Sequence, residues 1–322
     1  MKKFGFFGVG KIALHHLKTL KDLGHSVPVS VSKSIESESW KKFSSISKNT
    51  FFESSPNKLL LDYDLDGVFV CLPWNETEKY IELILKSKMP VLIEKPAALC
   101  FEKLNKAITN NKKYLNNKWV GYNRRFYKTV EYLKKRIKKG GLKVVNICIS
   151  EDIDNHIKKH GIEIIPYLLE FSSSHLLDLI HYLFGKIEIL KLFKYSQVFY
   201  GKNFDSVNGV LKSEDDIPIL LQINSNDPSS AGIFCKFNDN TYWSLSPLEK
   251  LTIYNKYKVI EENKNNVRQY VPSICKEIQE DYNFKPGFKS QMLEFIKPKG
   301  NNKLSNIRNQ LEILNFIKKI RR

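Results

Sequence analysis

The chain has 322 residues, a formal net charge of +18 and a hydrophobic fraction of 42%. This length and composition predict a globular protein with room for two domains, and they exclude a disordered chain. No apolar run approaches the roughly 18 residues that a transmembrane helix needs, so we expect no membrane partner. The five cysteines are widely spaced and form no CxxC pair, which favours a reducing cytoplasm and argues against a metal site.

The excess of positive charge is spread along the chain. Its densest clusters, residues 134–139 and 318–322, fall at the ends of amphipathic patterns, where cations suit the helix dipole. Most of the charge is therefore read as solvated surface, with attraction of an anionic substrate or cofactor as the alternative. The sequence contains no helix-turn-helix, zinc-finger or RNA-binding pattern, so we expect no nucleic-acid partner.

The first 120 residues alternate short apolar strands with amphipathic helices. Strands are expected at residues 4–8, 27–32, 67–72, 90–93 and 119–122, and helices at residues 11–20, 76–88 and 101–111. This alternation predicts βαβ units and a mostly parallel sheet. The strand at residues 67–72 is continuously apolar, as expected of a strand that is covered on both faces.

Beyond about residue 125, strands follow one another directly. They are expected at residues 142–150, 187–193, 206–211, 217–223, 232–237, 242–245 and 251–259, with helices at residues 130–139, 172–184, 289–296 and 304–320. Such a succession predicts an open, largely antiparallel sheet with helices on one side. The expected fold class is α/β, with a Rossmann dinucleotide-binding domain (residues 1–122) followed by a C-terminal α/β domain (residues 123–322).

The segment Gly8-Val-Gly10-Lys11-Ile12-Ala13 follows the first strand and opens the first helix. Its first glycine suits a tight turn, its second lets a pyrophosphate approach the backbone, and its alanine permits close helix–strand packing. The helix N-terminus would supply amides and a positive dipole to phosphates. This segment therefore predicts a dinucleotide site.

The end of the second strand selects between NAD and NADP. A carboxylate there would hold the ribose 2′-hydroxyl of NAD, but the run ends on Ser32 and Lys33. A hydroxyl and a cation suit the 2′-phosphate of NADP, which we slightly prefer to NAD. The alternatives are that this loop faces solvent and that Glu36 or Glu38 reaches the ribose.

The strand before Pro96 delivers Lys95 to its end, because proline cannot continue the hydrogen-bond ladder. Ligands of an open α/β sheet bind outside the carboxyl ends of its strands. The lysine and the glycine-containing loop are therefore expected to face one crevice. By itself, a lysine that closes a strand is more often a solvated end.

Five ordered motifs resemble those of the Gfo/Idh/MocA oxidoreductase family. They are Gly8-x-Gly10-x-x-Ala13, Leu72-Pro73-Trp74-Asn75, Ile93-Glu94-Lys95-Pro96, Gly121-Tyr122-Asn123-Arg124-Arg125-Phe126 and Ser174-His175-x-x-Asp178-x-x-x-Tyr182-Leu183-x-Gly185. The resemblance implies hydride transfer between NAD(P) and a sugar-type hydroxyl or ketone. We expect a nucleotide-linked or other anionic sugar of glycan biosynthesis, and a homodimer or homotetramer formed through the C-terminal sheet.

The resemblance also implies roles for particular residues. Lys95 and His175 would be catalytic, with the lysine on the reacting oxygen and the histidine exchanging the proton. The implied cofactor contacts are Gly8, Gly10, Lys11, Ile12, Ala13, Ser32, Lys33, Leu72, Pro73, Asn75 and Glu94, and the implied substrate contacts are Tyr122, Asn123, Arg124 and Asp178. No metal ligand is implied.

One position departs from the family pattern. Many dehydrogenases of the family carry an aspartate four residues before the histidine, and Phe171 occupies that position here. Glu170 would point elsewhere on a helix, although it could reach the site if the segment were a loop. Loss of acid–base help weakens a catalyst by about 10²–10⁴-fold without excluding hydride transfer. The departure leaves a second interpretation open, a dinucleotide-binding sensor or regulatory protein that does not catalyse.

Overall fold

The computed structural model describes residues 1–228, 231–262, 267–298 and 302–321. The chain divides into two compact units, one of residues 1–126 together with 282–322, the other of residues 127–281. The expected boundary lies after residue 122, with all later residues in one domain. The contacts instead assign residues 282–322 to the N-terminal unit, because apolar side chains of this last segment complete its core.

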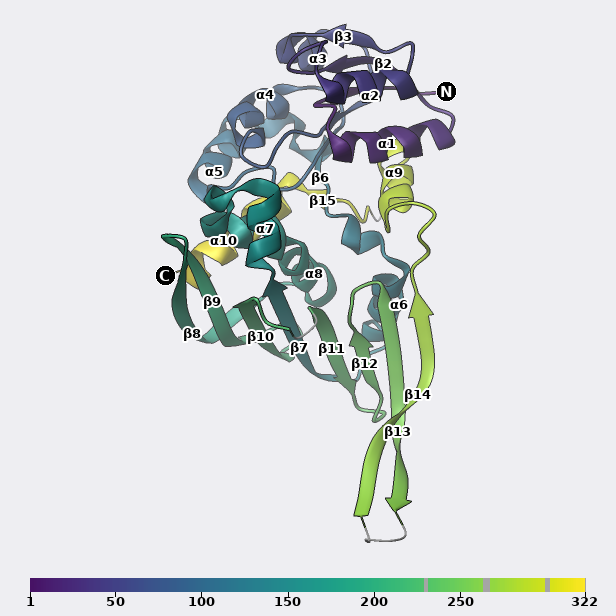
Figure 1. Cartoon of the computed structure of the whole chain (residues 1–322), viewed down its shortest axis with the longest axis vertical. Helices are drawn as coiled ribbons and strands as arrows, with labels where there is room; N and C mark the ends of the chain where they lie inside the picture. Colours follow the sequence, from purple (N-terminus) through teal and green to yellow (C-terminus); the bar gives the residue numbers. More distant parts are fainter. Residues whose placement is uncertain (229–230, 263–266, 299–301, 322) are drawn as a thin grey trace. The chain divides into compact units, whose positions relative to one another are not determined.

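The N-terminal unit contains a seven-stranded sheet in the order β15-β6-β5-β4-β1-β2-β3. Figure 1 labels β2 and β3 at one end of this order and β6 and β15 at the other. Its strands are β1 (Lys3–Phe7), β2 (Ser26–Val31), β3 (Phe51–Glu53), β4 (Gly67–Val70), β5 (Val91–Ile93), β6 (Lys118–Val120) and β15 (Ser305–Asn306). All neighbours pair in parallel except β15, which pairs antiparallel with β6. The strand order reverses at β1, the place where such sheets bind ligands. The predicted Rossmann architecture is confirmed.

Helices connect and cover these strands. They are α1 (Lys11–Asp22), α2 (Glu38–Ile46), α3 (Pro56–Leu61), η1 (Thr77–Tyr80), α4 (Ile81–Lys86), α5 (Phe101–Asn110), η2 (Lys112–Asn117), η3 (Asn123–Phe126), α9 (Phe288–Ile296) and α10 (Ile307–Arg321). Helix α9 packs on α1 and η3, and α10 packs on α5 and β6. Helices α9 and α10 thus contribute to the helical layers that must cover the faces of a parallel sheet.

Aromatic contacts seat α9 on the sheet. The ring centroid of Phe295 lies 5.0 Å from that of Phe69 in β4 and 5.7 Å from that of Trp119 in β6. Further along the chain, the buried hydroxyl of Tyr122 donates to Oε1 of Gln310 in α10 at 2.6 Å. These contacts join the two ends of the chain into one core.

The amino-terminal edge of the same sheet holds a buried lysine. The ammonium of Lys118, the first residue of β6, donates to the backbone oxygens of Ser87, Met89 and Tyr114 at 2.9, 3.0 and 3.2 Å, and to Oδ1 of Asn117. Burial lowers the pKa of Lys118 to about 7, whereas these oxygen acceptors favour its charged form. The lysine satisfies carbonyls that the ends of neighbouring elements leave without donors.

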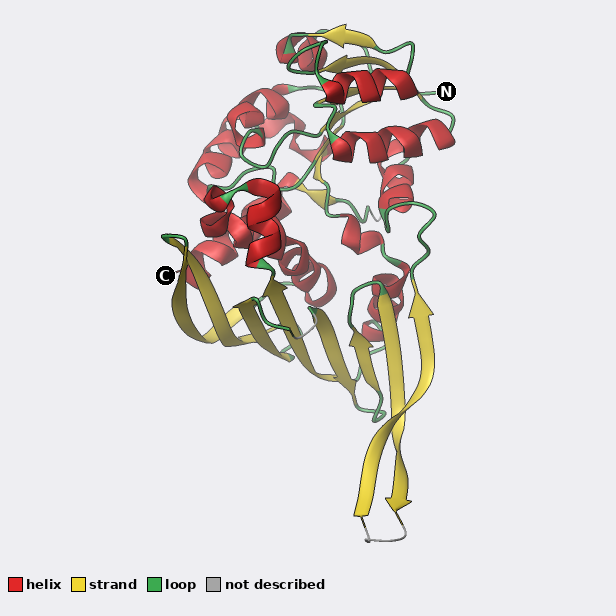
Figure 2. Ribbon diagram, viewed as in Figure 1, coloured by secondary structure: helices red, strands yellow, loops and turns green. Residues whose placement is uncertain are grey.

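The second unit contains an eight-stranded sheet in the order β14-β13-β12-β11-β7-β10-β9-β8, whose strands are labelled in Figure 1 and drawn in yellow in Figure 2. Its strands are β7 (Leu142–Glu151), β8 (Glu188–Phe199), β9 (Lys202–Lys212), β10 (Pro218–Ser225), β11 (Gly232–Phe237), β12 (Tyr242–Leu245), β13 (Lys250–Glu262) and β14 (Val267–Gln279). Only the β7–β10 pair is parallel. The predicted open, largely antiparallel sheet is confirmed.

The helical elements of this unit are α6 (Lys128–Ile137), α7 (Ile153–His160), η4 (Ile162–Tyr167), η5 (Leu169–Ser173) and α8 (Ser174–Phe184). Helix α6 packs against β12 and β14, and η5 packs against β7. Helix α7 and strand β14 are absent from the sequence predictions, and β13 runs three residues beyond its predicted end. Within the described ranges, no helix is both long and apolar enough to cross a membrane.

Candidate functional site

The turn after β1 depends on glycine at position 8. Gly8 has a φ of +93°, and its N–H donates to the backbone oxygen of Val31 at 2.9 Å. A Cβ at this position would lie 2.5 Å from the backbone oxygen of Cys71, at the end of β4. Any side chain would therefore strain the turn and clash with the neighbouring strand.

Helix α1 begins with its amides uncovered. Its N-cap residue, Gly10, has an extended backbone and no side chain that could accept a hydrogen bond from the helix amides. The first turn of the helix contains no acidic residue. A Cβ on Gly10 would meet no atom within 4 Å, whereas Ala13 is fully buried against the sheet. Lys11 is exposed and Ile12 is partly buried. Open space in front of free amides and a positive helix end fits a phosphate group, as the sequence predicts.

Ser32 and Lys33 follow the last residue of β2, with Ser32 partly buried and Lys33 exposed. Neither side chain has a hydrogen-bond or ion-pair partner in the described part of the chain. The two carboxylates considered as alternatives contact lysines of their own: Glu36 lies 3.3 Å from Lys41, and Glu38 lies 3.6 Å from Lys42.

A third carboxylate lies near the same strand end. Glu53 closes β3 opposite Val31, and its oxygens accept hydrogen bonds from the Ser55 N–H and the Tyr63 hydroxyl at 2.8 and 3.2 Å. The bond from the Ser55 amide lowers the pKa of Glu53, so the group stays charged. These two hydrogen bonds hold the Glu53 carboxylate against residues that follow β3.

The residues after β4 border the glycine turn. Leu72 Cδ2 would lie 3.2 Å from a Cβ on Gly8. Pro73 and Asn75 are exposed. These three predicted cofactor contacts therefore lie at the carboxyl end of β4, beside the turn that follows β1.

Glu94 and Lys95 follow β5 at the same end of the sheet. Glu94 is only 9% exposed, and its Oε1 lies 2.7 Å from Nε2 of His16, which is 1% exposed. Lys95 is partly exposed and precedes a cis peptide bond to Pro96. The predicted juxtaposition of Lys95 with the α1 loop follows from the parallel sheet, since both succeed carboxyl ends of its strands.

His16 is a site residue that the sequence predictions omit. Its helix places it on the buried face with Leu17 and Leu20, so a polar residue within an apolar stripe was the available signal. Burial alone would raise the pKa of Glu94. The hydrogen bond from His16 and the charges of His16, Lys285 and Lys95 outweigh burial and lower that pKa. Glu94 is therefore a buried carboxylate that remains ionised beside Lys95.

The segment after β6 contains three of the four predicted substrate contacts. Tyr122 is 1% exposed, and its hydroxyl contacts Gln310. Asn123 is also buried, and its Nδ2 donates to the backbone oxygen of Pro286 at 2.9 Å. Arg124 is partly exposed. Of the three, the arginine presents the most accessible polar group.

Comparison with known proteins identifies this unit. Residues 2–122 match the Gfo/Idh/MocA family model, described as "Oxidoreductase family, NAD-binding Rossmann fold". Over these residues, which are less than half of the chain, the protein is thus similar to the Gfo/Idh/MocA family. The match contains the glycine loop, the residues after β4 and the Glu94-Lys95-Pro96 segment. The family resemblance inferred from the motifs is confirmed.

A myo-inositol 2-dehydrogenase from Thermotoga maritima is 25% identical over 138 residues, which are 43% of this chain and 41% of that protein. This match thus spans about two fifths of the length of that relative.

Two solved structures share the whole fold. An oxidoreductase from Thermotoga maritima is 17% identical, with a TM-score of 0.76 over 100% of this chain and 96% of its own. A UDP-N-acetylglucosamine 3-dehydrogenase from Acidithiobacillus ferrooxidans is 15% identical, with a TM-score of 0.72 over 99% of this chain and 96% of its own. At these identities the likeness establishes the two-unit architecture alone.

In the second unit, His175 is the second residue of α8 and is partly exposed, while Asp178, three residues later, is fully buried. The preceding residues form a π-helix, η5, and not the α-helical turn that the sequence predicts from residue 172. Phe171, at the position of the family aspartate, packs its ring against that of His160 at 4.8 Å between centroids. Glu170 lies in the same π-helix and is 2% exposed.

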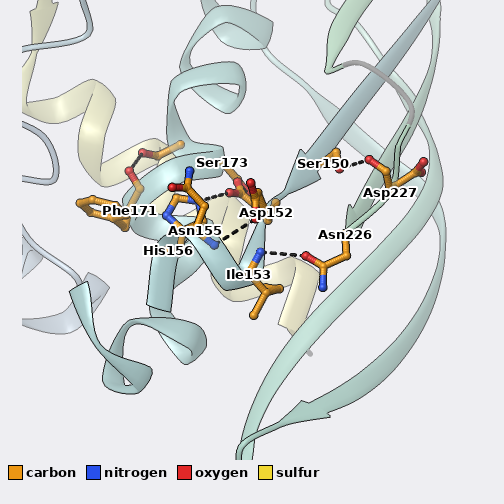
Figure 3. Close-up of polar contacts among 11 residues, drawn as sticks. Ser150, Asp152, Ile153, Asn155, His156, Phe171, Ser173, Asn226 and Asp227 are labelled. Atoms are coloured by element: carbon orange, nitrogen blue, oxygen red, sulfur yellow. Dashed lines mark hydrogen bonds and ion pairs between the residues drawn. The ribbon is translucent and has the colours of Figure 1, made fainter. Parts of the chain in front are cut away.

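A second carboxylate stabilises the start of α8. Glu151, the last residue of β7, accepts a hydrogen bond from the Ser173 hydroxyl at 2.6 Å, and its other oxygen lies 2.9 Å from Nε2 of His156. Both partners, Ser173 and His156, are labelled in Figure 3. Glu151 is 2% exposed, and both oxygens have partners. This network, which the sequence predictions omit, fixes the π-helix that leads into His175.

Proposed function

We propose that the chain is an NAD(P)-dependent oxidoreductase acting on a sugar-type hydroxyl or ketone. The observation that carries this proposal is that the open α1 N-terminus follows β1 and Lys95 follows β5, so both lie at the carboxyl end of one parallel sheet, with only β4 between the two strands. The family match of residues 2–122 supports the same activity. Bound nicotinamide would supply or accept the hydride.

The chain's own residues would bind the cofactor, polarise the reacting oxygen and exchange its proton. Gly8 and Gly10 would admit the diphosphate, and the α1 amides would bind it. Lys95 would polarise the reacting oxygen, and His175 would exchange its proton. Ionised Glu94 would hold a compensating negative charge beside Lys95, with His16 as its hydrogen-bond partner.

The preferred cofactor is NADP. Support comes from Ser32 and Lys33, whose side chains have no partner in the described chain, and from the lysine contacts of Glu36 and Glu38. The preferred substrate is an anionic sugar such as a nucleotide sugar. The formal charge of +18 and the likeness in fold to a UDP-N-acetylglucosamine dehydrogenase support that class.

A second function has an observation in its favour. Phe171 fills the position of the family aspartate with a ring that contacts His160 and His156. A dinucleotide-binding sensor without turnover would tolerate that replacement. Spectrophotometric assay of NADPH and NADH oxidation with a panel of keto-sugars, including nucleotide-linked ones, separates the two functions. Turnover supports the enzyme, whereas cofactor binding without turnover on any member supports the sensor.

We further propose self-association through the C-terminal sheet, in a reducing cytoplasm. One face of the β13–β14 ribbon carries Tyr257, Val259 and Tyr270, which are 67%, 52% and 64% exposed. The register places Val259 opposite Tyr270 on the same face. A second copy could cover this apolar face by twofold pairing. Light scattering should show a dimer or tetramer that dissociates in a Tyr257→Lys, Tyr270→Lys double variant, while a monomeric wild type would contradict the proposal.

A further inference from the structure

Lys285 stands at a fixed position beside α1. Its backbone oxygen accepts the N–H of Phe288 at 3.1 Å, and Asn123 binds the next carbonyl, that of Pro286, at 2.9 Å. Gly287 completes the turn with a φ of +76°. The turn before α9 is therefore hydrogen-bonded to η3, the segment that follows β6. This bond fixes the backbone position from which the Lys285 side chain extends.

A stack of side chains leads from Lys285 to the site. Its Nζ lies 4.7 Å from the ring centroid of Phe288. That ring stacks on His16 with centroids 4.7 Å apart and planes at 27°, and His16 contacts Glu94 at 2.7 Å. The ring of Phe288 therefore links the ammonium of Lys285 to the His16–Glu94 pair.

Several cations meet at this point. Desolvation, together with repulsion from Arg124 and Lys11, lowers the pKa of Lys285, while Glu94 opposes that shift. Desolvation and the charges of Lys285 and Lys11, among others, also lower the pKa of His15. Lys11 of α1 and Arg124 of η3 thus each lie close enough to repel the ammonium of Lys285, and helix α9, which follows Lys285, packs on both of these elements.

These cations have no carboxylate partner of their own. Over the described ranges, Lys11, Arg124 and Lys285 form no side-chain hydrogen bond or ion pair. The nearby carboxylate, Glu94, is already bonded to His16. Lys11 and Lys285 remain exposed and Arg124 partly exposed, so a ligand can reach all three. Three cations that face a single carboxylate keep an excess of positive charge, which suits an anionic ligand.

We propose that Lys285, with Lys11 and Arg124, binds a phosphate group of a ligand held by the N-terminal unit. This inference rests on the proposed function and adds to it a cation from outside the Rossmann sequence pattern. The phosphate belongs to the dinucleotide or to a nucleotide sugar, and both offer the same charged oxygens to an ammonium.

The test measures dissociation constants of NADPH, NADH and UDP-N-acetylglucosamine by fluorescence titration, without turnover. Lys285→Met should weaken binding of at least one of them about 10- to 100-fold, as expected for loss of a charge-assisted contact. Lys285→Arg should stay within a few-fold of wild type. Lys289→Met is the matched control, because Lys289, the second residue of α9, lies four residues after Lys285 and pairs with Asp22 at 2.8 Å.

The outcomes separate the sources of phosphate. Weaker binding of both dinucleotides assigns Lys285 to the cofactor, and weaker binding of the nucleotide sugar alone assigns it to the substrate. Unchanged affinity of Lys285→Met for all three ligands overturns this inference and leaves the proposed function intact. A wild-type protein that binds none of them overturns both. If Lys285→Met unfolds, Lys285→Gln is titrated in its place with the same criteria.

Discussion

Nε2 of His16 lies 2.7 Å from Oε1 of Glu94, and this contact joins the buried face of α1 to the residue before Lys95. Both side chains are almost completely buried. A buried carboxylate costs several kcal/mol unless a partner compensates it. The pair therefore couples the stability of the first helix to the charge beside the proposed catalytic lysine.

His16→Ala should destabilise the protein by about 3 kcal/mol, because it leaves the Glu94 carboxylate buried without its partner. Glu94→Gln, which removes the charge, should cost less. Urea unfolding of the two variants at neutral pH measures the difference. Equal losses would show that the charge of Glu94 has no part in the effect.

The lowered pKa of Glu94 predicts a pH dependence. A carboxyl whose pKa is lower when folded contributes stability above its unfolded pKa, about 4.3, and loses it as pH falls through the folded value. The stability difference between wild type and Glu94→Gln should therefore shrink below about pH 4.3. Acid titration of urea midpoints measures this difference, and a constant difference would contradict the assignment.

Gly8 and Gly10 should respond differently to alanine. Gly8→Ala places a Cβ 2.5 Å from a backbone oxygen at a φ of +93°, so we expect a loss of about 2 kcal/mol or more in unfolding free energy. Gly10→Ala meets no atom within 4 Å and should fold normally, but its methyl should obstruct the diphosphate. Thermal unfolding and NADPH titration measure both effects. Unchanged dinucleotide affinity in Gly10→Ala would remove the loop from the site.

Lys118→Met should destabilise the sheet edge by about 2–4 kcal/mol, since three backbone carbonyls lose their donor. Burial lowers the pKa of Lys118 to about 7. The Lys118 amine of the unfolded chain has a pKa of about 10.4, so between pH 7 and pH 10.4 it binds a proton that the folded chain does not bind. The stability of wild type relative to Lys118→Met should therefore rise with pH across that window.

Urea unfolding at pH values from about 7 to 10 tests the slope, whose limit is about 1.4 kcal/mol per pH unit. The exposed neighbour Lys88 supplies the control Lys88→Met, which should show no such dependence. A flat difference for Lys118→Met would mean that the oxygen acceptors keep the ammonium charged.

Lys33→Met should weaken NADPH binding about 10-fold and leave NADH binding unchanged, because only NADPH carries a 2′-phosphate. Lys48→Met removes an exposed lysine of the same unit and serves as the control for charge alone. Titration of both cofactors gives the affinity ratio. A ratio equal to that of wild type would refute the preference for NADP at this loop.

The sequence predicted both sheets because their periodicities differ: continuous apolar runs in the parallel sheet and successive strands in the antiparallel one. It missed the return of residues 282–322 to the first unit, since that packing depends on contacts such as Phe295 with Phe69. Strand β14 was missed because charged residues and Pro272 interrupt its apolar pattern. The π-helix before His175 arises from tertiary contacts, including the bond from Ser173 to Glu151.

The candidate site was predictable where the backbone itself demands a residue type. Gly8, Ala13 and the strand end at Lys95 have local signatures. His16 and Lys285 have no such local signature. The role of His16 follows from its contact with Glu94, 78 residues away in the sequence, and that of Lys285 follows from its contact with the ring of Phe288. Side chains that gather from distant segments require the fold before they can be assigned.

Lys95 is the proposed catalytic residue of the dinucleotide site. The most direct measurement compares cofactor affinity and turnover for wild type and Lys95→Ala on the keto-sugar that wild type reduces best. We predict equal NADPH affinity and a kcat lower by about 10²–10⁴-fold in the variant. Undiminished turnover by Lys95→Ala, or a cofactor-saturated wild type that reduces no sugar, would contradict the account.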